Sequence, residues 1–375
     1  MNILVLNYEY PPLGGGAAPV SRELSQQLAK RGHQVDVVTM GFGDLSAFSY
    51  ENGVSIYRLK CIRTHKSSCK PWEQYSYLLA LRFFMRKHMK THHYDVCHCH
   101  FVIPTGEAAK WVSKKYDIPY VVTAHGSDVE GHNSKKSMVI MHRFLRPFWK
   151  QIVGNSYAVA SPSVYLENLM RNNYPTGNYV FIPNGIEYHK YSDNTFKENK
   201  KKTILVMGRL QSFKNVQMII DAFSKIPKEL LIDWKMEIVG DGPYREFLEK
   251  RVSDIGLKEF VSFTGWIDNN TPEHLQHIYD ASIYISASRF ENCPMSVIEA
   301  AAAKCCLLLS DIPAHRQLIS DDECFFNIDD VGELANKLEK LLDDGANVKP
   351  ISVEAYDWSQ IILKYEHLLY KASKP

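Results

Sequence analysis

The stretch ILVLNYEYPPLGGG at residues 3–16 decides the predicted fold. It joins an apolar, β-rich run at residues 3–7 to a turn that contains three consecutive glycines. A helical pattern follows and ends at Lys30-Arg31-Gly32, and residues 35–39 then predict a second strand. A strand, a helix and a second strand form a βαβ unit, which predicts a parallel sheet with helices on its faces.

The second half of the chain repeats this beginning. The apolar run at residues 204–207 leads into Gly208-Arg209-Leu210, and residues 216–223 predict a helix. Further strands are predicted at residues 235–239, 260–263 and 281–286. The predicted fold class is α/β, with two doubly wound, Rossmann-like domains that face each other across a cleft. The predicted parts are an N-terminal domain at residues 1–185, a linker at 186–202, a C-terminal domain at 203–352 and a helix at 353–375. We expect this last helix to brace the N-terminal domain, and the alternative is that it completes the second domain.

Composition excludes several classes of protein. Forty-four Lys and Arg residues against 42 Asp and Glu residues give a net charge of +2, so no overall field draws the chain to nucleic acid or to a membrane. With 45% hydrophobic residues, the 375-residue chain has enough apolar surface for buried cores and is not expected to be disordered. Its beginning lacks the pattern of a signal peptide, and no apolar run approaches about 18 residues. We therefore expect a cytoplasmic protein whose eight cysteines are reduced.

Two glycine-containing turns are typical of anion sites. Gly15 and Gly16 lie between a strand and a helix, where backbone N–H groups and the helix dipole favour a phosphate. Their spacing is not that of a NAD-binding motif, and a glycine turn required only for packing is the alternative. Arg209 and Lys214 follow the first strand of the second domain, where two cations suit a diphosphate. Solvated surface cations are the alternative for this pair.

The segment from Glu291 to Glu299 contains two acids near a predicted helix start. Pro294 favours the first turn of a helix, so Glu291 lies on the loop before the helix and Glu299 lies inside it. The backbone N–H groups of residues 295–297 would form an anion site between the two acids, which can accept hydrogen bonds from sugar hydroxyls. This pattern indicates a sugar nucleotide. The alternative is that both acids only stabilise the helix dipole.

Two segments that contain histidines are candidates for a functional site. His125 follows a buried strand and precedes Gly126, a position where active-site side chains lie in open α/β sheets. A hydrogen-bonded structural histidine is the alternative for His125. Cys97-His98-Cys99-His100 alternates along a strand, so its cysteines and histidines lie on opposite faces and cannot surround one ion. We expect no metal site there.

Residues 58–93 form a basic and aromatic segment with nine cations, in which Glu73 is the only acid. Such an amphipathic surface indicates contact with anionic lipid or with a lipid-linked acceptor. The alternative is an ordinary solvated helix face. The first interpretation adds peripheral contact with the inner face of the membrane to the cytoplasmic prediction.

Together these segments resemble glycosyltransferase group 1, or family 4, whose members are retaining, nucleotide-sugar-dependent enzymes with a GT-B fold. The resemblance runs from residues 11–16 through 125–128, 184–185, 208–215 and 239–243 to 291–300. It implies polysaccharide biosynthesis or related chemistry without a catalytic metal or cofactor, with a UDP- or GDP-sugar as co-substrate. The roles that the resemblance implies are donor diphosphate binding by Gly15, Gly16, Arg209, Lys214, Met295 and Ser296, ribose binding by Glu299, contact with the donor sugar by His125 and Glu291, and a border around the base at Gly240, Trp266 and Ile267.

The resulting hypothesis is transfer of a sugar to an acceptor hydroxyl with retention. Cations and helix amides would neutralise the leaving diphosphate, while Glu291 acts either as nucleophile or as charge stabiliser. Two rival hypotheses are a nucleotide-sugar 2-epimerase of the same architecture and a non-catalytic sugar-nucleotide binder. The sequence leaves open whether the acceptor is a carbohydrate, a lipid-linked sugar or a small molecule, and it does not specify an oligomeric state.

Overall fold

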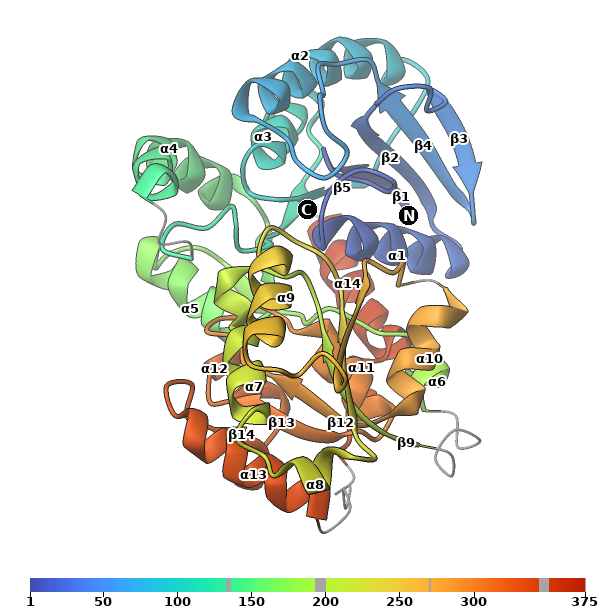
Figure 1. Ribbon diagram of the computed structural model, residues 1–375. Helices are drawn as coiled ribbons and strands as arrows, with labels where there is room; N and C mark the ends of the chain where they lie inside the picture. The colour runs from blue at the N-terminus through green and yellow to red at the C-terminus, as the bar shows by residue number, and fades with distance from the viewer. Residues whose placement is uncertain (133–135, 193–199, 270, 344–350, 375) are drawn as a thin grey trace. The chain divides into compact units, whose positions relative to one another are not determined.

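The computed structural model describes residues 1–132, 136–192, 200–269, 271–343 and 351–374. The chain divides into two compact units (Figure 1). The first unit contains Met1–Gly185 and Trp358–Pro375, and the second contains Ile186–Asp357. Each unit holds a mostly or wholly parallel sheet with helices on both faces, which confirms the α/β prediction of two doubly wound halves.

Within the described residues, the first unit has an eight-stranded sheet in the order β3-β4-β2-β1-β5-β6-β7-β8. Only β3 pairs in the antiparallel direction, with β4. The long run of parallel neighbours means that the carboxyl ends of these strands meet at one edge, where binding residues are expected. The strands are β1 (Asn2–Leu6), β2 (Gln34–Met40), β3 (Phe48–Glu51), β4 (Val54–Leu59), β5 (Val96–His100), β6 (Tyr120–Thr123), β7 (Ala158–Ser161) and β8 (Tyr179–Phe181).

Alternation along these strands divides the first unit into two apolar cores. Leu4 and Leu6 of β1 face one core, whereas Ile3 and Val5 face the other. The helices around the first core are α2 (Pro71–His88), α3 (Thr105–Tyr116), α4 (Lys136–Asn155) and α5 (Val164–Asn173), and those around the second are α1 (Ala17–Lys30) and α14 (Trp358–Ala372).

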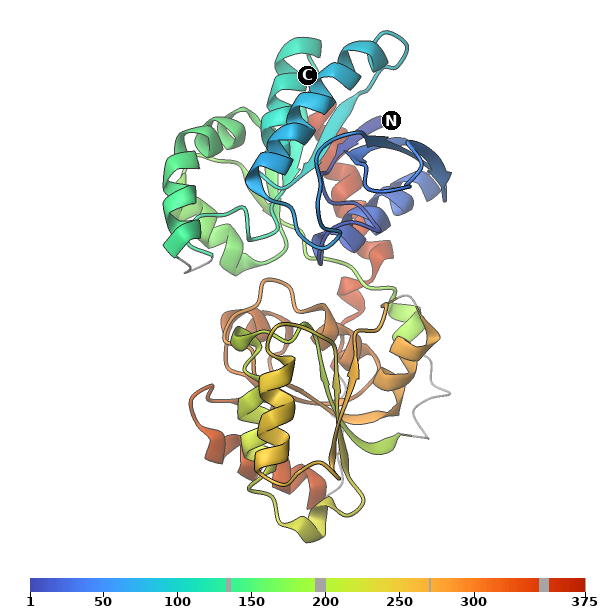
Figure 2. The ribbon, with the colours of Figure 1, turned by 45° about the horizontal axis from the view of Figure 1, so that its top comes forward.

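Helix α14 therefore completes the first unit from the far end of the chain, beside α1 (Figure 2). Glu366 on α14 bonds to Arg31 and to His33 Nε2, at 2.7 and 2.8 Å. The helix starts at Trp358, so the predicted start at residue 353 is wrong: Val353 is buried in a core of the second unit. Gly185 is matched to this packing, because a Cβ there would lie 2.6 Å from the Trp358 ring.

The second unit has a six-stranded sheet in the order β11-β10-β9-β12-β13-β14, again counted over the described residues. Its strands are β9 (Lys201–Met207), β10 (Lys235–Val239), β11 (Val261–Gly265), β12 (Ala281–Ser286), β13 (Cys306–Ser310) and β14 (Phe325–Phe326). Its helices are α6 (Tyr188–Tyr191), η2 (Ser212–Lys214), α7 (Val216–Phe223), α8 (Lys228–Leu231), α9 (Arg245–Asp254), α10 (Pro272–Asp280), α11 (Met295–Ala302), α12 (Pro313–Leu318), η3 (Asp322–Cys324), α13 (Val331–Asp343) and η4 (Glu354–Tyr356).

The predicted linker at residues 186–202 is not a separate connection where the structure describes it. Ile186 and Tyr191 are buried in a core of the second unit, and β9 already begins at Lys201. The prediction overlooked α6, in which Tyr191 is buried and Tyr188 packs against the same core. Residues 193–199 of this segment lie outside the described residues. In the described parts of the chain, none of the helices combines the length and apolar character that crossing a bilayer requires.

Candidate functional site

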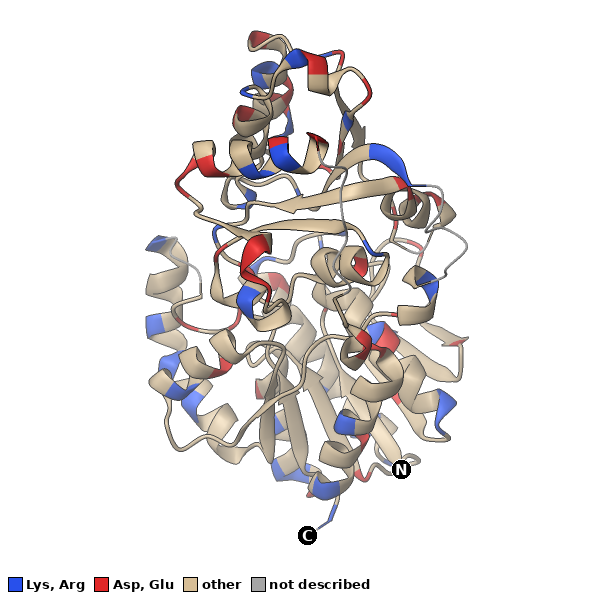
Figure 3. Ribbon diagram, turned by 90° about the horizontal axis from the view of Figure 1, so that it is seen from below, with Lys and Arg blue, Asp and Glu red and all other residues tan. Residues whose placement is uncertain are grey.

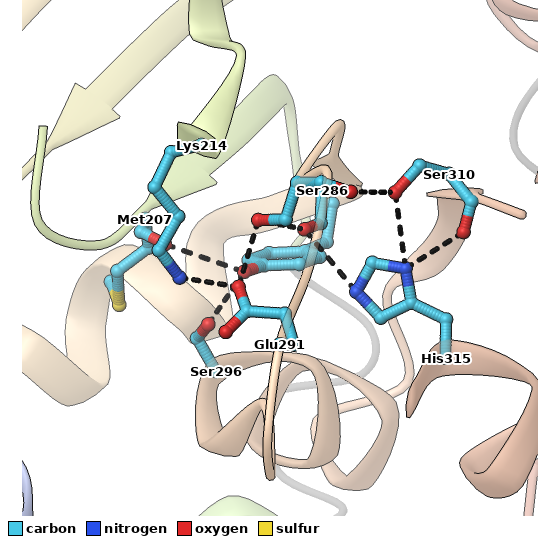
Figure 4. Close-up of polar contacts among 9 residues, drawn as sticks. Met207, Lys214, Ser286, Glu291, Ser296, Ser310 and His315 are labelled. Carbon is cyan, nitrogen blue, oxygen red and sulfur yellow. Dashed lines mark hydrogen bonds and ion pairs between the residues drawn. The ribbon is translucent and has the colours of Figure 1, made fainter. Parts of the chain in front are cut away.

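Two neighbouring parallel strands position the central residues of the second unit. Strand β9 ends before the loop that carries Arg209 and Lys214, and strand β12 ends before the loop that carries Glu291. Because parallel neighbours end at the same edge, residues 77 positions apart in sequence come into contact. Lys214 forms an ion pair with Glu291, so the structure brings together a predicted phosphate ligand and a predicted sugar ligand (Figure 4).

The Glu291 carboxylate is held in its charged form. Its Oε1 accepts hydrogen bonds from Lys214 and from Ser288 Oγ, the latter at 2.7 Å. Burial alone would raise the pKa of Glu291, but the charge of Lys214 and these two hydrogen bonds bring it below its usual value. Both bonds end on Oε1, so within the described chain Oε2 is placed to accept a hydrogen bond from a ligand.

A buried group of polar residues behind Glu291 was missed by the sequence analysis. His315 Nδ1 lies 2.8 Å from the Ser310 carbonyl oxygen, and its Nε2 lies 3.5 Å from Ser286 Oγ (Figure 4). Ser310 Oγ donates to the Ser288 carbonyl oxygen at 2.7 Å, which fixes the loop before Glu291. Burial lowers the pKa of His315, so the ring is neutral at physiological pH. The sequence did contain a signal for His315, because a histidine that follows a predicted strand was the reason for singling out His125.

Helix α11 begins at Met295, directly after Pro294, as the sequence predicts. The amides of Met295 and Ser296 have no acceptor within the helix, because the first turn of any helix leaves them unpaired. Val297 differs from the expectation: its N–H donates to the Pro294 carbonyl oxygen at 3.0 Å. Ser296 also offers its hydroxyl, which accepts a hydrogen bond from Tyr284 at 2.7 Å. The anion site predicted at residues 295–297 therefore reduces to its first two amides.

Arg209 and Lys214 border a narrow recess of about 20 Å³. Its other lining residues come from the ends of β9 and β12 and from α7: Val206, Met207, Gly208, Leu210, Val216, Ile219, Ile285, Ser286, Ala287 and Ser288. The Arg209 side chain is exposed, whereas Lys214 is half-buried against Glu291. Two cations of different exposure thus lie at one edge of the sheet, an arrangement that suits a diphosphate.

Glu299 lies on the inner side of α11, with only 7% of its surface exposed. Its carboxylate bonds to the Tyr191 hydroxyl and lies 3.6 Å from His274 Nε2. Glu291 and Glu299 both raise the pKa of Tyr284, whose burial is the larger cause, so the two acids lie near one side chain. The geometry keeps Glu299 close to the predicted sugar ligand and pairs it with two residues that the sequence did not indicate.

The predicted border of the base lies at the same edge of the sheet. The Gly240 N–H donates to the Gly265 carbonyl oxygen at 2.8 Å, and a Cβ at Gly240 would lie 2.0 Å from the Gly208 oxygen. Glycine is therefore required at Gly240, where φ is +136°. Trp266 is 73% exposed, while Ile267 packs partly against the core around α11. The backbone at Gly240 thus contacts the loops at Gly208 and Gly265.

In the first unit, the glycine turn already contacts an internal anion. The Gly15 N–H donates to Glu9 Oε2 at 3.2 Å, and burial raises the pKa of Glu9. Packing explains Gly14, where φ is +102° and a Cβ would lie 2.6 Å from Glu9 Cβ. It does not explain Gly15 and Gly16, whose Cβ positions face open space. A carboxylate thus occupies part of the predicted phosphate cradle.

His125 is held by a second buried histidine. Its Nε2 lies 3.0 Å from His100 Nδ1, and its backbone N–H donates to Asp128 Oδ1 at 2.9 Å. Burial, helped by the neighbouring His98, lowers the pKa of His125 to about 3, so the ring is neutral. The structure therefore combines the two interpretations of His125: the residue lies at the carboxyl edge of the sheet and is also hydrogen-bonded by the fold.

The histidines and cysteines of β5 lie on opposite faces, as predicted. Cys97 and Cys99 pack in one core, whereas the His98 ring lies 5.6 Å from the Tyr365 ring of α14. Among the described residues, a group with metal-ligand chemistry is formed instead by Asp36, His88 and His92. The Tyr94 hydroxyl bonds to both Asp36 and His88, each at 2.6 Å, so these groups satisfy one another and we assign no metal to them.

Comparison with known proteins agrees with this geometry. Residues 188–358 match the profile described as glycosyl transferases group 1, and residues 14–190 match the profile described as glycosyltransferase family 4. The chain belongs to this glycosyltransferase family. An α-monoglucosyldiacylglycerol synthase of Streptococcus pneumoniae is 26% identical over 86% of this chain and 74% of its own length.

Solved structures show the GT-B fold of this glycosyltransferase. A sucrose-phosphate synthase from Thermosynechococcus elongatus superposes with a TM-score of 0.81 at 18% identity, over 99% of this chain and 98% of that chain. HepE from Anabaena, solved in complex with UDP-glucose, superposes with a TM-score of 0.75 at 15% identity, over 99% and 100% of the two chains.

Proposed function

We propose that this glycosyltransferase transfers a sugar from a UDP- or GDP-sugar to an acceptor hydroxyl with retention of configuration and without a catalytic metal. The observation that carries the proposal is the contact of Lys214 with Glu291 beside the exposed Arg209 and the first turn of α11. It places groups that suit a diphosphate next to a charged acid that suits a sugar. The solved complex of HepE with UDP-glucose supports a nucleotide-sugar donor.

The proposed chemistry is stabilisation of a leaving diphosphate. Breaking the anomeric C–O bond places negative charge on the diphosphate and positive charge on the sugar ring. Arg209, Lys214 and the amides of Met295 and Ser296 neutralise the first charge, which is the role that a metal ion would otherwise have. Glu291 stabilises the second charge, and its free Oε2 accepts a hydrogen bond from a sugar hydroxyl. The acceptor hydroxyl attacks from the face that the diphosphate leaves and passes its proton to the departing phosphate oxygen.

The family resemblance implies roles for the remaining predicted ligands of each unit. Glu299 binds the ribose, Gly240, Trp266 and Ile267 border the base, and the neutral His125 contacts the transferred sugar. Gly15 and Gly16 add backbone N–H groups for the diphosphate, in which case the Glu9 carboxylate has to leave Gly15.

The test is an assay of nucleoside diphosphate release from UDP- and GDP-sugars with a panel of carbohydrate, lipid and small-molecule acceptors. We expect release that depends on an acceptor, survives a chelator and gives a product with the anomeric configuration of the donor by NMR. Conversion of the donor sugar without acceptor would indicate an epimerase instead. Donor binding with no release under any acceptor would indicate a non-catalytic binder.

A further inference from the structure

Helix α2 exposes a continuous apolar row. Its large side chains at 39% exposure or more follow one another at intervals of three and four residues, which places them on one side of the helix. They are Trp72, Tyr75, Leu79 and Phe83. The opposite side of α2 is buried in the core through Tyr77, Leu81 and Met85. The basic segment predicted at residues 58–93 is thus only partly a surface, because Arg58 and Arg63 are also buried.

Helix α4 exposes a second row, which the sequence analysis did not single out. Its exposed apolar residues are Val139, Ile140, Phe144 and Phe148, and Phe144 is 77% exposed. Its inner side is buried through Trp149, Ile152 and Val153. A soluble helix normally covers such residues or replaces them with polar ones, since large exposed apolar patches mark interaction sites.

The two rows belong to one surface. Helices α2, α3 and α4 pack through the same core on the same face of the sheet. The Arg82 guanidinium of α2 lies 5.8 Å from the Trp111 ring of α3, and Lys110 of α3 donates to Gln151 of α4 at 3.2 Å. We call the outward side of these three helices the helix platform.

The helix platform is strongly basic. Three helices carry ten cations against two acids in a chain whose net charge is only +2. Of the two acids, Glu73 is buried and Glu107 is paired with Lys110 at 2.8 Å. The charged residues are coloured in Figure 3. The cations are Arg82, Arg86, Lys87, Lys110, Lys114, Lys115, Lys136, Arg143, Arg146 and Lys150.

We propose that the helix platform docks the protein on an anionic lipid bilayer. Apolar side chains flanked by cations match the boundary between acyl chains and negative headgroups. A second copy of this chain fits less well, because two such platforms would bring like charges together. The proposal deepens the proposed function and rests on it for the nature of the acceptor. Helix α4 follows the loop that carries His125. Docking through α4 therefore brings that loop to the membrane surface, which bears the hydroxyl of a lipid or of a lipid-linked sugar.

The test is sedimentation of the full chain with vesicles of phosphatidylcholine alone or mixed with phosphatidylglycerol. We expect binding to the mixed vesicles that weakens with added salt. Replacing Phe144 and Phe148 together by Ser, or Arg143 and Lys150 together by Gln, should each lower the partition coefficient about tenfold or more. The matched control replaces Leu363 and Tyr370 by Ser, because these residues are similarly exposed on α14, at the other face of the same sheet.

Several outcomes would overturn the proposal. They are absence of binding to mixed vesicles, equal loss in the Leu363/Tyr370 control, or variants at Phe144 and Phe148 that bind normally while their thermal unfolding is unchanged. A dimer that only the platform variants disrupt, without vesicle binding, would assign the face to self-association instead.

The test is separate from that of the proposed function. Donor binding measured by titration with UDP or GDP does not require vesicles. Vesicle binding without donor binding would reject the proposed transferase reaction and keep the docking surface. Donor binding and transfer to a soluble acceptor without vesicle binding would reject the docking surface alone.

Discussion

Lys214 and Glu291 form an ion pair, so the effect of burying either side chain depends on the other. Each would be costly to bury unpaired, whereas the ion pair lets both side chains be partly buried and keeps the pKa of Glu291 below its usual value. A donor diphosphate would draw Lys214 toward its own charge and leave Glu291 to the sugar. Under the proposed function, one ligand would thus engage both members of the pair.

Replacing Lys214 by Ala should lower turnover about 100-fold or more, because one of the fixed charges that oppose the leaving diphosphate is lost. Arg209→Ala should have an effect of the same order. Lys214→Arg is the conservative comparison and should retain more activity than Lys214→Ala. Release of the nucleoside diphosphate measures the turnover. If both alanine variants turn over within about threefold of the unchanged protein, the proposed role is contradicted.

His100 should fix the tautomer of His125. His100 Nε2 is buried and has no partner among the described residues. An unpaired buried N–H is rarer than an unpaired acceptor, so His100 is expected to donate from Nδ1 and His125 to carry its proton on Nδ1. His100→Leu should then lower turnover about tenfold, the cost of one lost hydrogen bond to a buried group.

The control for His100→Leu is His100→Asn, whose amide N–H takes the position of Nδ1 and should restore most of the activity. Nitrogen NMR of labelled histidine should report the proton of His125 on Nδ1. A spectrum with the proton on Nε2, or equal activity of the Leu and Asn variants, would show that His100 does not act through this bond.

At the scale of elements, strand β5 buries two histidines that lie beside a third on the loop after β6. Burial lowers the pKa of His98 and of His125 to about 3, and it lowers the pKa of His100 as well. Their ordinary value is 6.5. The unfolded chain therefore binds protons between pH 6.5 and 3 that the folded chain does not. The contribution of these histidines to the free energy of unfolding of the first unit is therefore fully present above pH 6.5. It is lost as the pH falls through this window.

Three such groups should make the free energy of unfolding fall by about 4 kcal/mol for each pH unit near pH 5. Unfolding by urea, followed through first-unit probes between pH 7 and pH 4.5, measures this slope. His98→Asn removes one of the groups and should reduce the slope by about a third. A slope that does not change in this variant would show that His98 is protonated in the folded chain.

At the scale of the whole molecule, the first unit depends on the end of the chain. Helix α14 buries seven residues against β5, β6 and α1, which corresponds to about 10 kcal/mol or more of apolar burial. That is comparable to the entire stability of a typical domain. The first unit is therefore expected to need both ends of the sequence.

A chain that ends at Asp357 should lose the fold of its first unit and keep that of its second. Hydrogen exchange measures this: amides of β1 and β5 should lose protection, while those of β9 and β12 keep it. Glu366→Gln is a milder companion, since it removes only the ion pairs with Arg31 and His33. Retained protection in β1 after truncation would contradict the dependence on α14.

Periodicity and loop chemistry by themselves determined the α/β class, the helix at residues 216–223 and the position of Lys214, Glu291 and His125 after strands. These signals are local, because a strand's alternation and a helix's start depend on neighbouring residues. Only the tertiary structure decided that Ser288 and His315 support Glu291, that Glu9 occupies the glycine turn and that α6 belongs to the second unit. It also decided that α2 and α4, each with an exposed apolar row, pack on the same face of one sheet. Contacts between distant segments follow from how the sheets and helices pack, which a pattern within one segment does not encode.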